Sequence, residues 1–332
     1  MAEKRVVVLF PCVGRRVALV EAFRRACVEI GLSGSMIGTD FRDTAPALEV
    51  CDRRHLARRV ADPGYGEEMA ALVREEGVKL VVPTVDLDLA IWARLRGPLA
   101  EEGCTVLVSC EQVVEICQDK RKTFTFLREH GFATPQTWEP EEAIANCNGF
   151  PYFLKPRDGY ASRGAYVAHD AEELAFYARR VPNCIVQEYV EGAEYSVDLL
   201  VDFAGRVRCA VPRRRLEVRA GEVSKAETVK HRGMMDQGRA IVEALGAGPG
   251  VVTLQCFLRP DGEIVFIELN PRFGGGAPLA FEAGADYPRW ILELWSGRKA
   301  EIGFDTWREG LRMLRYDAAV WVEAAGTKSD QA

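Results

Sequence analysis

The segment 265–272 reads VFIELNPR and brings three chemically useful side chains together. Alternate residues of a β-strand share a face, so Glu268 and Asn270 point to one side and their apolar neighbours to the other. Carboxylate and amide oxygens are ligands that Mg²⁺ prefers, and Arg272 beside them suits a phosphate group bound to that ion. The segment therefore predicts a magnesium and phosphate site, although an edge strand with a solvated polar face would give the same pattern.

A further polar residue belongs to the hairpin expected around this segment. Gln255 interrupts an apolar strand expected over 251–258, which the turn 259–262 joins to the segment above. A loop of two or four residues places Gln255 on the same face as Glu268, whereas a three-residue loop places it on the opposite face. In the first alternative Gln255 is a third candidate metal ligand.

The composition of the 332-residue chain is typical of a soluble globular protein, with 48% hydrophobic and 28% charged residues. This length allows two or three domains. The net charge of −6 argues against a general nucleic-acid or membrane partner, which would need a basic face. Ten cysteines occur singly, without a CxxC pair, which fits the reducing cytoplasm and argues against a structural zinc site. No signal peptide or membrane span is expected.

Apolar strands and helices alternate along the first hundred residues. Strands are expected over 6–10, 36–39, 80–84 and 105–108, with helices at about 16–30, 67–76 and before the last strand. This alternation predicts a doubly wound parallel sheet with helices on both faces. One long helix is expected to follow, from about residue 110 to 129.

Ligands of doubly wound sheets bind beyond the carboxyl ends of the strands. The charged residues expected there are candidates for binding a second substrate: Arg15, Arg16, Asp40, Asp86 and Asp88. For Asp86 and Asp88, capping of the following helix is an equally good interpretation. The turn after the first strand contains no G-x-G-x-x-G pattern, so a dinucleotide site is not favoured.

The second half of the chain has the pattern of an α+β fold. Strands that pair as hairpins are expected over 185–190, 195–202 and 207–211, with a last strand over 313–322 and a frayed tail over 325–332. Lys155 ends an apolar strand and precedes a loop with Gly159 and Gly164, whose backbone N–H groups could approach a triphosphate. No Walker A loop is present, so the chain is not a P-loop protein.

With these segments the chain resembles the ATP-grasp superfamily, and within it the carbamoyl-phosphate-synthase-like branch of single-chain ligases. The resemblance covers residues 4 to about 322 and rests on the segments DK at 119–120, LKP at 154–156, QEYV at 187–190, EYSVD at 194–198 and ELNPR at 268–272. It implies a doubly wound pre-ATP-grasp domain over 1–112 and a two-lobed ATP-grasp domain over 113–312, followed by a strand and tail over 313–332. The small lobe would span about 135–190 and the catalytic lobe about 191–312.

The resemblance also implies roles for individual residues. The residues that would bind ATP are Lys120 and Lys155 at the phosphates, Ser162, Arg163 and Gly164 in a lid over them, Glu188, Tyr189 and Val190 around the adenine, and Glu194 at the ribose. Gln255, Glu268 and Asn270 would hold two Mg²⁺ ions, with Mn²⁺ as an alternative metal. Arg272 would stabilise the transferred phosphoryl group.

The activity implied is that of an ATP-dependent carboxylate–amine ligase that forms an acyl phosphate and releases ADP and phosphate. Arg213, Arg215 and Lys225 lie on the segment expected to flank the acceptor carboxylate. Phosphorylation of bicarbonate or a small carboxylate is the alternative. The segment 219–228 contains no histidine, unlike carbamoyl phosphate synthase, and the chain lacks duplicated halves, which argues against carbamoyl phosphate synthesis itself. The partners expected are small-molecule substrates and, at family level, a second copy in a homodimer.

Overall fold

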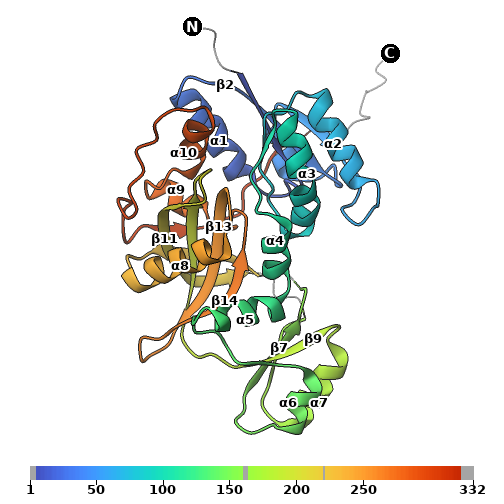
Figure 1. The fold of residues 1–332 in the computed structure, drawn as a ribbon, viewed down its shortest axis with the longest axis vertical. Helices are drawn as coiled ribbons and strands as arrows, with labels where there is room; N and C mark the ends of the chain where they lie inside the picture. Colours follow the sequence, from blue (N-terminus) through green and yellow to red (C-terminus); the bar gives the residue numbers. More distant parts are fainter. Residues whose placement is uncertain (1–4, 160–163, 220, 323–332) are drawn as a thin grey trace, which may run out of the picture.

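Three β-sheets form the framework of the computed structural model, which describes residues 5–159, 164–219 and 221–322. The five-stranded sheet near the N-terminus lies at one end of the molecule (Figure 1). The four-stranded sheet lies at the other end, and the six-stranded sheet lies between them. Within the described residues, no helix combines the length and the apolar character needed to span a bilayer.

The N-terminal sheet is parallel and has the strand order β3-β2-β1-β4-β5. Its strands are β1 (Arg5–Phe10), β2 (Ser33–Asp40), β3 (Arg53–Leu56), β4 (Leu80–Val81) and β5 (Thr105–Val106). Helix α1 (Val17–Glu29) packs against the even-numbered residues of β1, whereas α2 (Tyr65–Glu75) and α3 (Leu89–Glu101) pack against the odd-numbered ones. Helices therefore cover both faces, and the predicted doubly wound domain is confirmed. The expected strands 80–84 and 105–108 are shorter, with two residues each.

The single helix expected over 110–129 is wrong, because Asp119 divides it into α4 (Glu111–Gln118) and α5 (Lys120–Glu129). Asp119 has an extended backbone, and its carboxylate accepts hydrogen bonds from the N–H groups of Arg121 (2.9 Å) and Lys122 (3.2 Å). The same carboxylate forms a two-bond ion pair with Arg157, at 2.8 and 2.7 Å. Asp119 thus caps the second helix and fixes it to the segment after Lys155.

The small sheet has the order β6-β9-β7-β8 and carries helices α6 (Pro140–Ala145) and α7 (Ala171–Arg180). Its strands are β6 (Thr137–Trp138), β7 (Tyr152–Pro156), β8 (Tyr166–Ala168) and β9 (Cys184–Glu188). β9 pairs with β6 and β7, so the expectation that it forms a hairpin with the next strand is wrong. The buried residues of this lobe form a hydrophobic cluster of their own, separate from the main core.

The six-stranded sheet is antiparallel, with the order β14-β13-β10-β11-β12-β15. Its strands are β10 (Ala193–Val201), β11 (Val207–Arg219), β12 (Glu222–Thr228), β13 (Gly250–Leu258), β14 (Ile264–Asn270) and β15 (Arg312–Leu314). Helix α8 (Arg232–Leu245) packs on one face. Gln255 lies opposite Glu268, so the two side chains share the other face and the three-residue-loop alternative is excluded.

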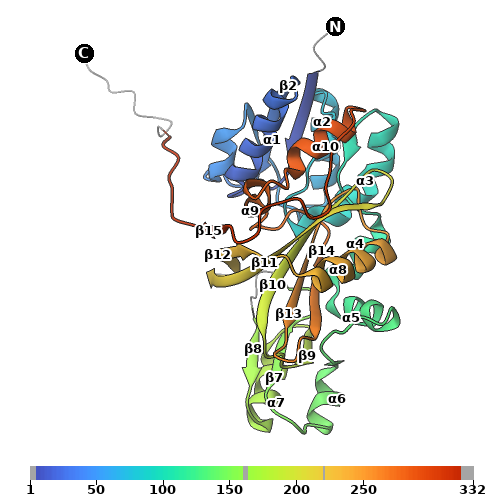
Figure 2. The ribbon, with the colours of Figure 1, turned by 90° about the vertical axis from the view of Figure 1, so that its left-hand side faces the viewer.

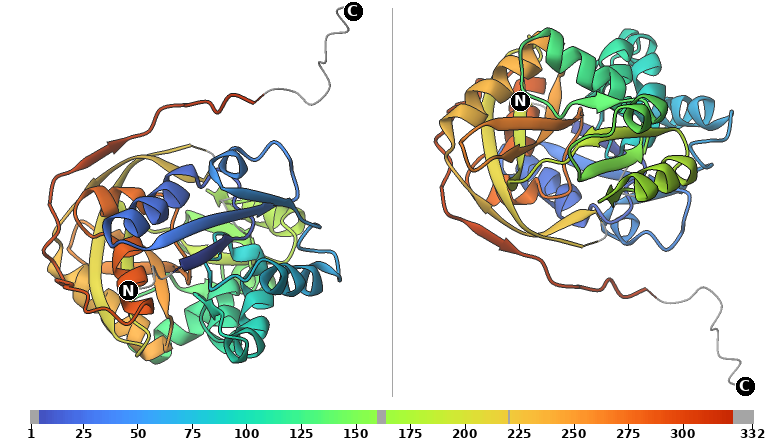
Figure 3. Two further views of the ribbon diagram at one scale, coloured as in Figure 1. Left: turned by 90° about the horizontal axis from the view of Figure 1, so that it is seen from above. Right: turned by 90° about the horizontal axis from the view of Figure 1, so that it is seen from below.

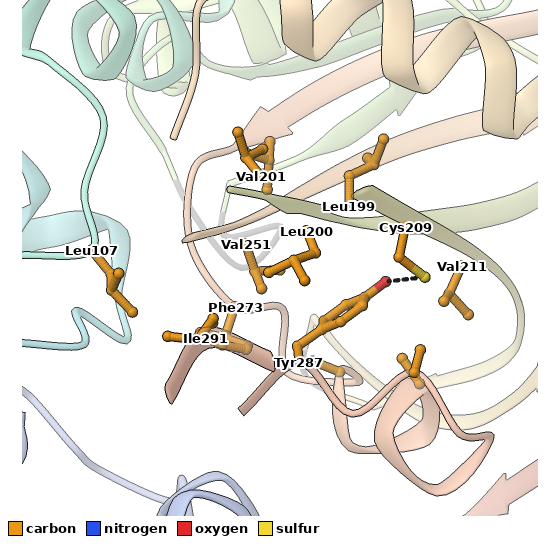
Figure 4. Close-up of a cluster of buried hydrophobic side chains, with 14 of the residues drawn as sticks. Leu107, Leu199, Leu200, Val201, Cys209, Val211, Val251, Phe273, Tyr287 and Ile291 are labelled. Atoms are coloured by element: carbon orange, nitrogen blue, oxygen red, sulfur yellow. Dashed lines mark hydrogen bonds between the residues drawn. The ribbon is translucent and has the colours of Figure 1, made fainter. Parts of the chain in front are cut away.

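The main core joins the six-stranded sheet to the N-terminal domain and to the helices α9 (Pro278–Glu282) and α10 (Tyr287–Trp295). Figure 4 shows Leu107, from the end of the N-terminal sheet, beside Val201 and Val251 of the central sheet and Ile291 of α10. The N-terminal domain is therefore packed directly against the central sheet, whereas the small lobe has a separate core.

The last strand is shorter than the expected 313–322. β15 pairs only with residues 225–227 of β12, and the chain then leaves the body of the molecule (Figures 2 and 3). Tyr316 and Trp321 are 85% and 91% exposed. The sequence has strand-forming residues there, but residues 315–322 form no strand in the structure. The frayed tail expected over 325–332 lies outside the described residues.

Replacing Asp119 with Ala should loosen α5. The cap contributes about 1 kcal/mol, so amide exchange in the first turn of α5 should accelerate about fivefold, as measured by hydrogen–deuterium exchange. Asp119→Asn keeps the capping oxygen and loses the charge, so it is the matched control and should accelerate exchange much less. Equal acceleration in both variants would show that the ion pair with Arg157, rather than the cap, holds the helix.

Candidate functional site

A cavity of about 790 Å³ lies where the three sheets meet. The small lobe contributes residues of β7 to β9, the central sheet contributes its polar face, and the N-terminal domain contributes the loop ends after β1 and β4. Most of the residues expected to bind substrates line this cavity: Arg16, Asp86, Lys120, Lys155, Glu188, Tyr189, Val190, Glu194, Arg213, Arg215, Gln255, Glu268 and Arg272.

The polar face of the central sheet follows from its register. Ser196 of β10 lies opposite Arg213 of β11 on one side and Gln255 of β13 on the other, and Gln255 in turn lies opposite Glu268. Directly opposed residues of an antiparallel sheet point to the same face. The register therefore places side chains from four strands in one row, opposite the face covered by α8.

Some expected site residues do not line the cavity. Lys225 follows the sheet alternation away from it, because Ala226 is opposite Arg215, and its ammonium group pairs with Glu217 at 2.6 Å on the exposed face. Asp40 accepts hydrogen bonds from the N–H groups of Gly14 and Arg42, both at 3.0 Å, within its own domain. Gly164 lies against Pro156, and Ser162 and Arg163 fall outside the described residues.

Asp88 is fully buried inside the N-terminal domain and does not reach the cavity. Its Oδ2 atom accepts hydrogen bonds from Tyr65 Oη (3.1 Å) and Trp92 Nε1 (2.9 Å). Burial raises the pKa of Asp88 to about 6, and the hydrogen bonds from Trp92 and Tyr65 oppose that rise. The structure also contradicts the capping interpretation, since neither Asp86 nor Asp88 forms a side-chain cap.

Asp86 instead joins the N-terminal domain to the central sheet. Its carboxylate binds the guanidinium group of Arg272 at 2.7 and 3.2 Å, although the two residues are 186 positions apart. Arg272 also donates to Asn270 Oδ1 at 3.0 Å. Burial lowers the pKa of Arg272, but Asp86 and the nearby Glu268 more than offset this, so its pKa lies above the ordinary value. Arg272 is therefore a fixed cation at the cavity wall.

Two lysines lie near Glu268 in the middle of the cavity. Burial lowers the pKa of Lys155 to about 8, with Glu268 opposing the shift and Lys120 adding to it. Burial also lowers the pKa of Lys120, and the charges of Glu268 and Asp158 oppose this shift. The ammonium group of Lys120 donates to the carbonyl oxygens of Arg157 and Gly159. Two desolvated cations in one cavity provide a place for a polyanion.

The end of the cavity next to the N-terminal domain, which is rich in arginine, contains a buried ion pair. Arg213 donates through Nε (2.6 Å) and Nη2 (3.1 Å) to Asp198, and the two side chains are 1% and 0% exposed. Thr253 Oγ1 also donates to Asp198, at 2.8 Å. Arg213 Nη1 is buried and has no hydrogen-bond partner among the described residues.

A second arginine of the same strand, Arg215, pairs with Glu194 at 3.0 Å. This ion pair ties the arginine to the carboxylate expected at the ribose.

The oxygen donors expected to bind metal fit Mg²⁺ only if a bound phosphate completes the ligand set. Among the described residues, no three His, Cys, Asp or Glu side chains are close enough together to hold an ion by themselves. Glu268 and Gln255 line the cavity, and Glu268 forms no ion pair with a described residue. Asn270 is less free, because its Oδ1 already accepts from Arg272 and it does not line the cavity. One carboxylate with amide oxygens and nucleotide phosphates is a usual environment for Mg²⁺.

Several cavity residues were missed in the sequence. Gly274, Gly275 and Gly276 directly follow Arg272 and Phe273, and a Cβ atom at Gly276 would lie 2.2 Å from Arg213 Nη1. Only glycine fits there, and the three consecutive glycines were a visible signal. Glu222 also lines the cavity, but no pattern in the sequence distinguished it from solvated charges.

The comparisons with known proteins agree with this architecture. A family model described as an ATP-grasp domain matches residues 117–276, and one described as a PylC-like N-terminal domain matches residues 8–107. The carbamoyl phosphate synthase large chain of Gemmatimonas aurantiaca is 25% identical over 264 residues, which are 72% of this chain and 24% of that protein. The chain thus spans about a quarter of the length of this relative.

Solved structures show the same fold at low identity. The biotin carboxylase of Campylobacter jejuni, solved as a β-γ-ATP complex, has a TM-score of 0.74 and 15% identity, covering 92% of this chain and 74% of its own. The L-amino acid ligase of Bacillus licheniformis has a TM-score of 0.69 and 17% identity, covering 89% and 75%. The chain thus contains an ATP-grasp domain preceded by a PylC-like N-terminal domain, and it has a distant similarity to the large chain of carbamoyl phosphate synthase.

Proposed function

We propose that the protein is an ATP-dependent carboxylate–amine ligase that acts through an acyl phosphate. The observation that carries this proposal is the cavity in which Lys120, Lys155 and Glu268 lie between an end with apolar walls in the small lobe and an arginine-rich end. The first end suits a nucleoside triphosphate, and the second suits an acceptor carboxylate. The division into domains at residues 112 and 312, the homodimer and the cytoplasmic location stay predictions.

The nucleotide would bind between the small lobe and the central sheet. Phe153, Phe257 and Ile267 give this end apolar walls on both sides, which suits an adenine ring. Backbone groups of the segment 188–190 would recognise the edge of the ring. Glu188 itself is held by Arg259 and by the N–H group of Gln136 (3.3 Å), so we propose a supporting role for its side chain.

The ribose and the phosphates would follow along the row of polar side chains. Glu194 would accept hydrogen bonds from the ribose hydroxyls, and burial raises the pKa of its carboxyl, with Arg215 opposing the rise. Lys120 and Lys155 would neutralise the phosphates. Glu268, Gln255 and Asn270 would hold Mg²⁺, which when bound neutralises phosphate charge and polarises the transferred group.

The acceptor carboxylate would attack the γ-phosphorus atom, and the bond to the β–γ bridging oxygen would break as ADP leaves. An amine would then attack the acyl carbon of the acyl phosphate, and phosphate would leave with the C–O bond electrons and take up the proton lost from the nitrogen. Arg272, fixed by Asp86, would stabilise charge on the phosphoryl oxygens. Positioning and charge stabilisation suffice for this chemistry, and no nucleophilic side chain is needed.

Phosphorylation of bicarbonate is the second candidate, and the size of the cavity weighs against it. Bicarbonate needs a small closed acceptor pocket, whereas this cavity reaches Arg16, Val85 and Leu87 in the N-terminal domain. Release of ADP in the presence of hydroxylamine and a panel of carboxylic acids, compared with bicarbonate, tests the two. Hydroxylamine converts an acyl phosphate to a hydroxamate, so a hydroxamate with an organic acid supports the ligase. ADP release with bicarbonate alone would contradict it.

ATP affinity should fall with rising pH because of Lys155. Its pKa of about 8 means that the protonated form, which attracts phosphate, is lost as the pH rises through 8. Titration calorimetry should show about tenfold weaker binding at pH 9 than at pH 7. Lys155→Met is the control and should bind weakly and equally at both pH values. If the affinity of the wild type for ATP does not change over this pH range, Lys155 does not contact the phosphates.

Replacing Glu268 with Gln should lower turnover about a hundredfold or more while leaving the thermal unfolding midpoint nearly unchanged. The substitution keeps the volume of the side chain and removes the charge proposed to hold Mg²⁺. Asn270→Ala should lower turnover less. Glu263→Gln, an exposed carboxylate on the same hairpin, is the control for ADP release. Near-normal turnover in Glu268→Gln would contradict the metal assignment.

Asp86→Asn should lower kcat about tenfold and change the KM for ATP little, because Arg272 loses the charge that fixes it. This expectation replaces the one drawn from the sequence alone, in which Asp86 contacted the acceptor directly. Asp236→Asn breaks an exposed ion pair with Arg232 on α8 and is the control. A raised acceptor KM with unchanged kcat in Asp86→Asn would restore the earlier interpretation.

A further inference from the structure

The end of the cavity next to the N-terminal domain contains more positive than negative charge. Arg16, Arg213 and Arg272 line this end, whereas Arg15, which is 75% exposed, and Arg315 lie behind it and pair with Glu222 of the cavity wall. Three carboxylates face them, those of Asp86, Asp198 and Glu222. Four of the five arginines therefore have a partner carboxylate, and Arg16 is the one for which no ion pair is found among the described residues.

Arg16 is placed to meet a ligand at the start of a helix. It is the residue before α1, a helix of 13 residues with no acidic residue in its first turn and no side-chain cap. Its Nη2 donates to Thr84 O at 3.1 Å, and its Nη1 lies on the side of Gly275. Burial lowers the pKa of Arg16 to about 10, and the like charge of Arg272 adds to this shift. A bound anion would relieve that repulsion and would also face the positive end of the helix dipole.

Arg213 supplies a second, independent sign of a missing ligand. Asp198 occupies its Nε and Nη2, so the buried Nη1 is the donor left over, and it lines the cavity next to Gly276. Buried donors in proteins are usually hydrogen-bonded, and this one belongs to a residue of the cavity wall. A side chain at Gly276 would collide with this atom, since a Cβ there would lie 2.2 Å from Nη1.

Glu222 already occupies part of this cluster. It accepts from Arg15 at 2.8 Å and lies 3.4 Å from Arg315, whose guanidinium also donates to Gly275 O. Burial raises the pKa of Glu222, but Arg16 and Arg15 more than offset this, so the pKa lies below its ordinary value. A carboxylate of the protein itself thus shows which chemistry these arginines select.

We infer that this end of the cavity binds a second anionic group of the acceptor, a carboxylate or a phosphate, in addition to the carboxylate that is activated. The inference rests on the proposed function. With Arg272 assigned to the phosphoryl group, Arg16 and the Nη1 atom of Arg213 remain for a second anionic group, so the preferred acceptor carries at least two negative charges. Arg16 and Arg213 are the residues that bind the second group.

Matched acids test the number of charges. Hydroxamate formation from glutarate should have a KM at least about tenfold lower than that from its monoamide glutaramate, because the amide removes one charge and keeps the length. A 3-phosphoglycerate and glycerate pair distinguishes phosphate from carboxylate as the second group. Equal KM values within both pairs would overturn the inference and leave the proposed function standing.

Arg16→Gln should remove the preference for the dianion, so that the ratio of the KM values for glutaramate and glutarate falls to about one. Arg214→Gln is the matched control, because Arg214 neighbours Arg213 on β11 but is exposed on the opposite face. If no acid is activated, the proposed function fails and calorimetry decides the inference separately. Glutarate or phosphoglycerate should then bind more tightly than its monoanionic partner to the wild type and lose that advantage in Arg16→Gln. Equal or absent binding would overturn the inference.

Discussion

The buried ion pair between Asp198 and Arg213 is the interaction on which the cavity depends. It lies on the polar face of the central sheet, fixed from three directions by Thr253, by the hydroxyl of Tyr287 on the Asp198 carbonyl (2.9 Å) and by the packed glycines. Removing one partner of such a pair costs about 3–5 kcal/mol, because the other charge stays buried. The pair therefore sets the direction of Arg213 and prevents larger residues at the loop that follows Arg272.

The positions of the hydrophobic cores determine which parts can move relative to one another. The N-terminal domain and the central sheet share one core, and Arg272 is further tied to Asp86 across their boundary. The arginine-rich end of the cavity is therefore built from two parts that are packed against each other and are not expected to move relative to one another. The small lobe has its own core, and the end of the cavity that we propose binds the nucleotide lies between it and the sheet. Opening and closing around a nucleotide thus needs no disruption of the main core.

Local patterns in the sequence identified much of this fold and most of the candidate site. Alternation along the segment 265–272 correctly placed Glu268 on a polar face, and the strand–helix rhythm predicted the parallel sheet. The same reasoning failed where a local signal competes with another. At Asp119 a capping carboxylate interrupts a helical pattern, and after β15 a strand-forming sequence is not part of any sheet.

The sequence by itself determined the element types and the order of the polar residues, because alternation and capping act over a few neighbouring positions. Only the tertiary structure decided which charges meet. Asp86 and Arg272 are 186 residues apart, and no local sequence pattern around either residue predicts that they form an ion pair. Lys225 and Arg213 have the same charge in the sequence, yet the register turns one to the surface and the other into the cavity. Such pairings depend on the packing of distant segments, and one position in strand register reverses the face of a side chain.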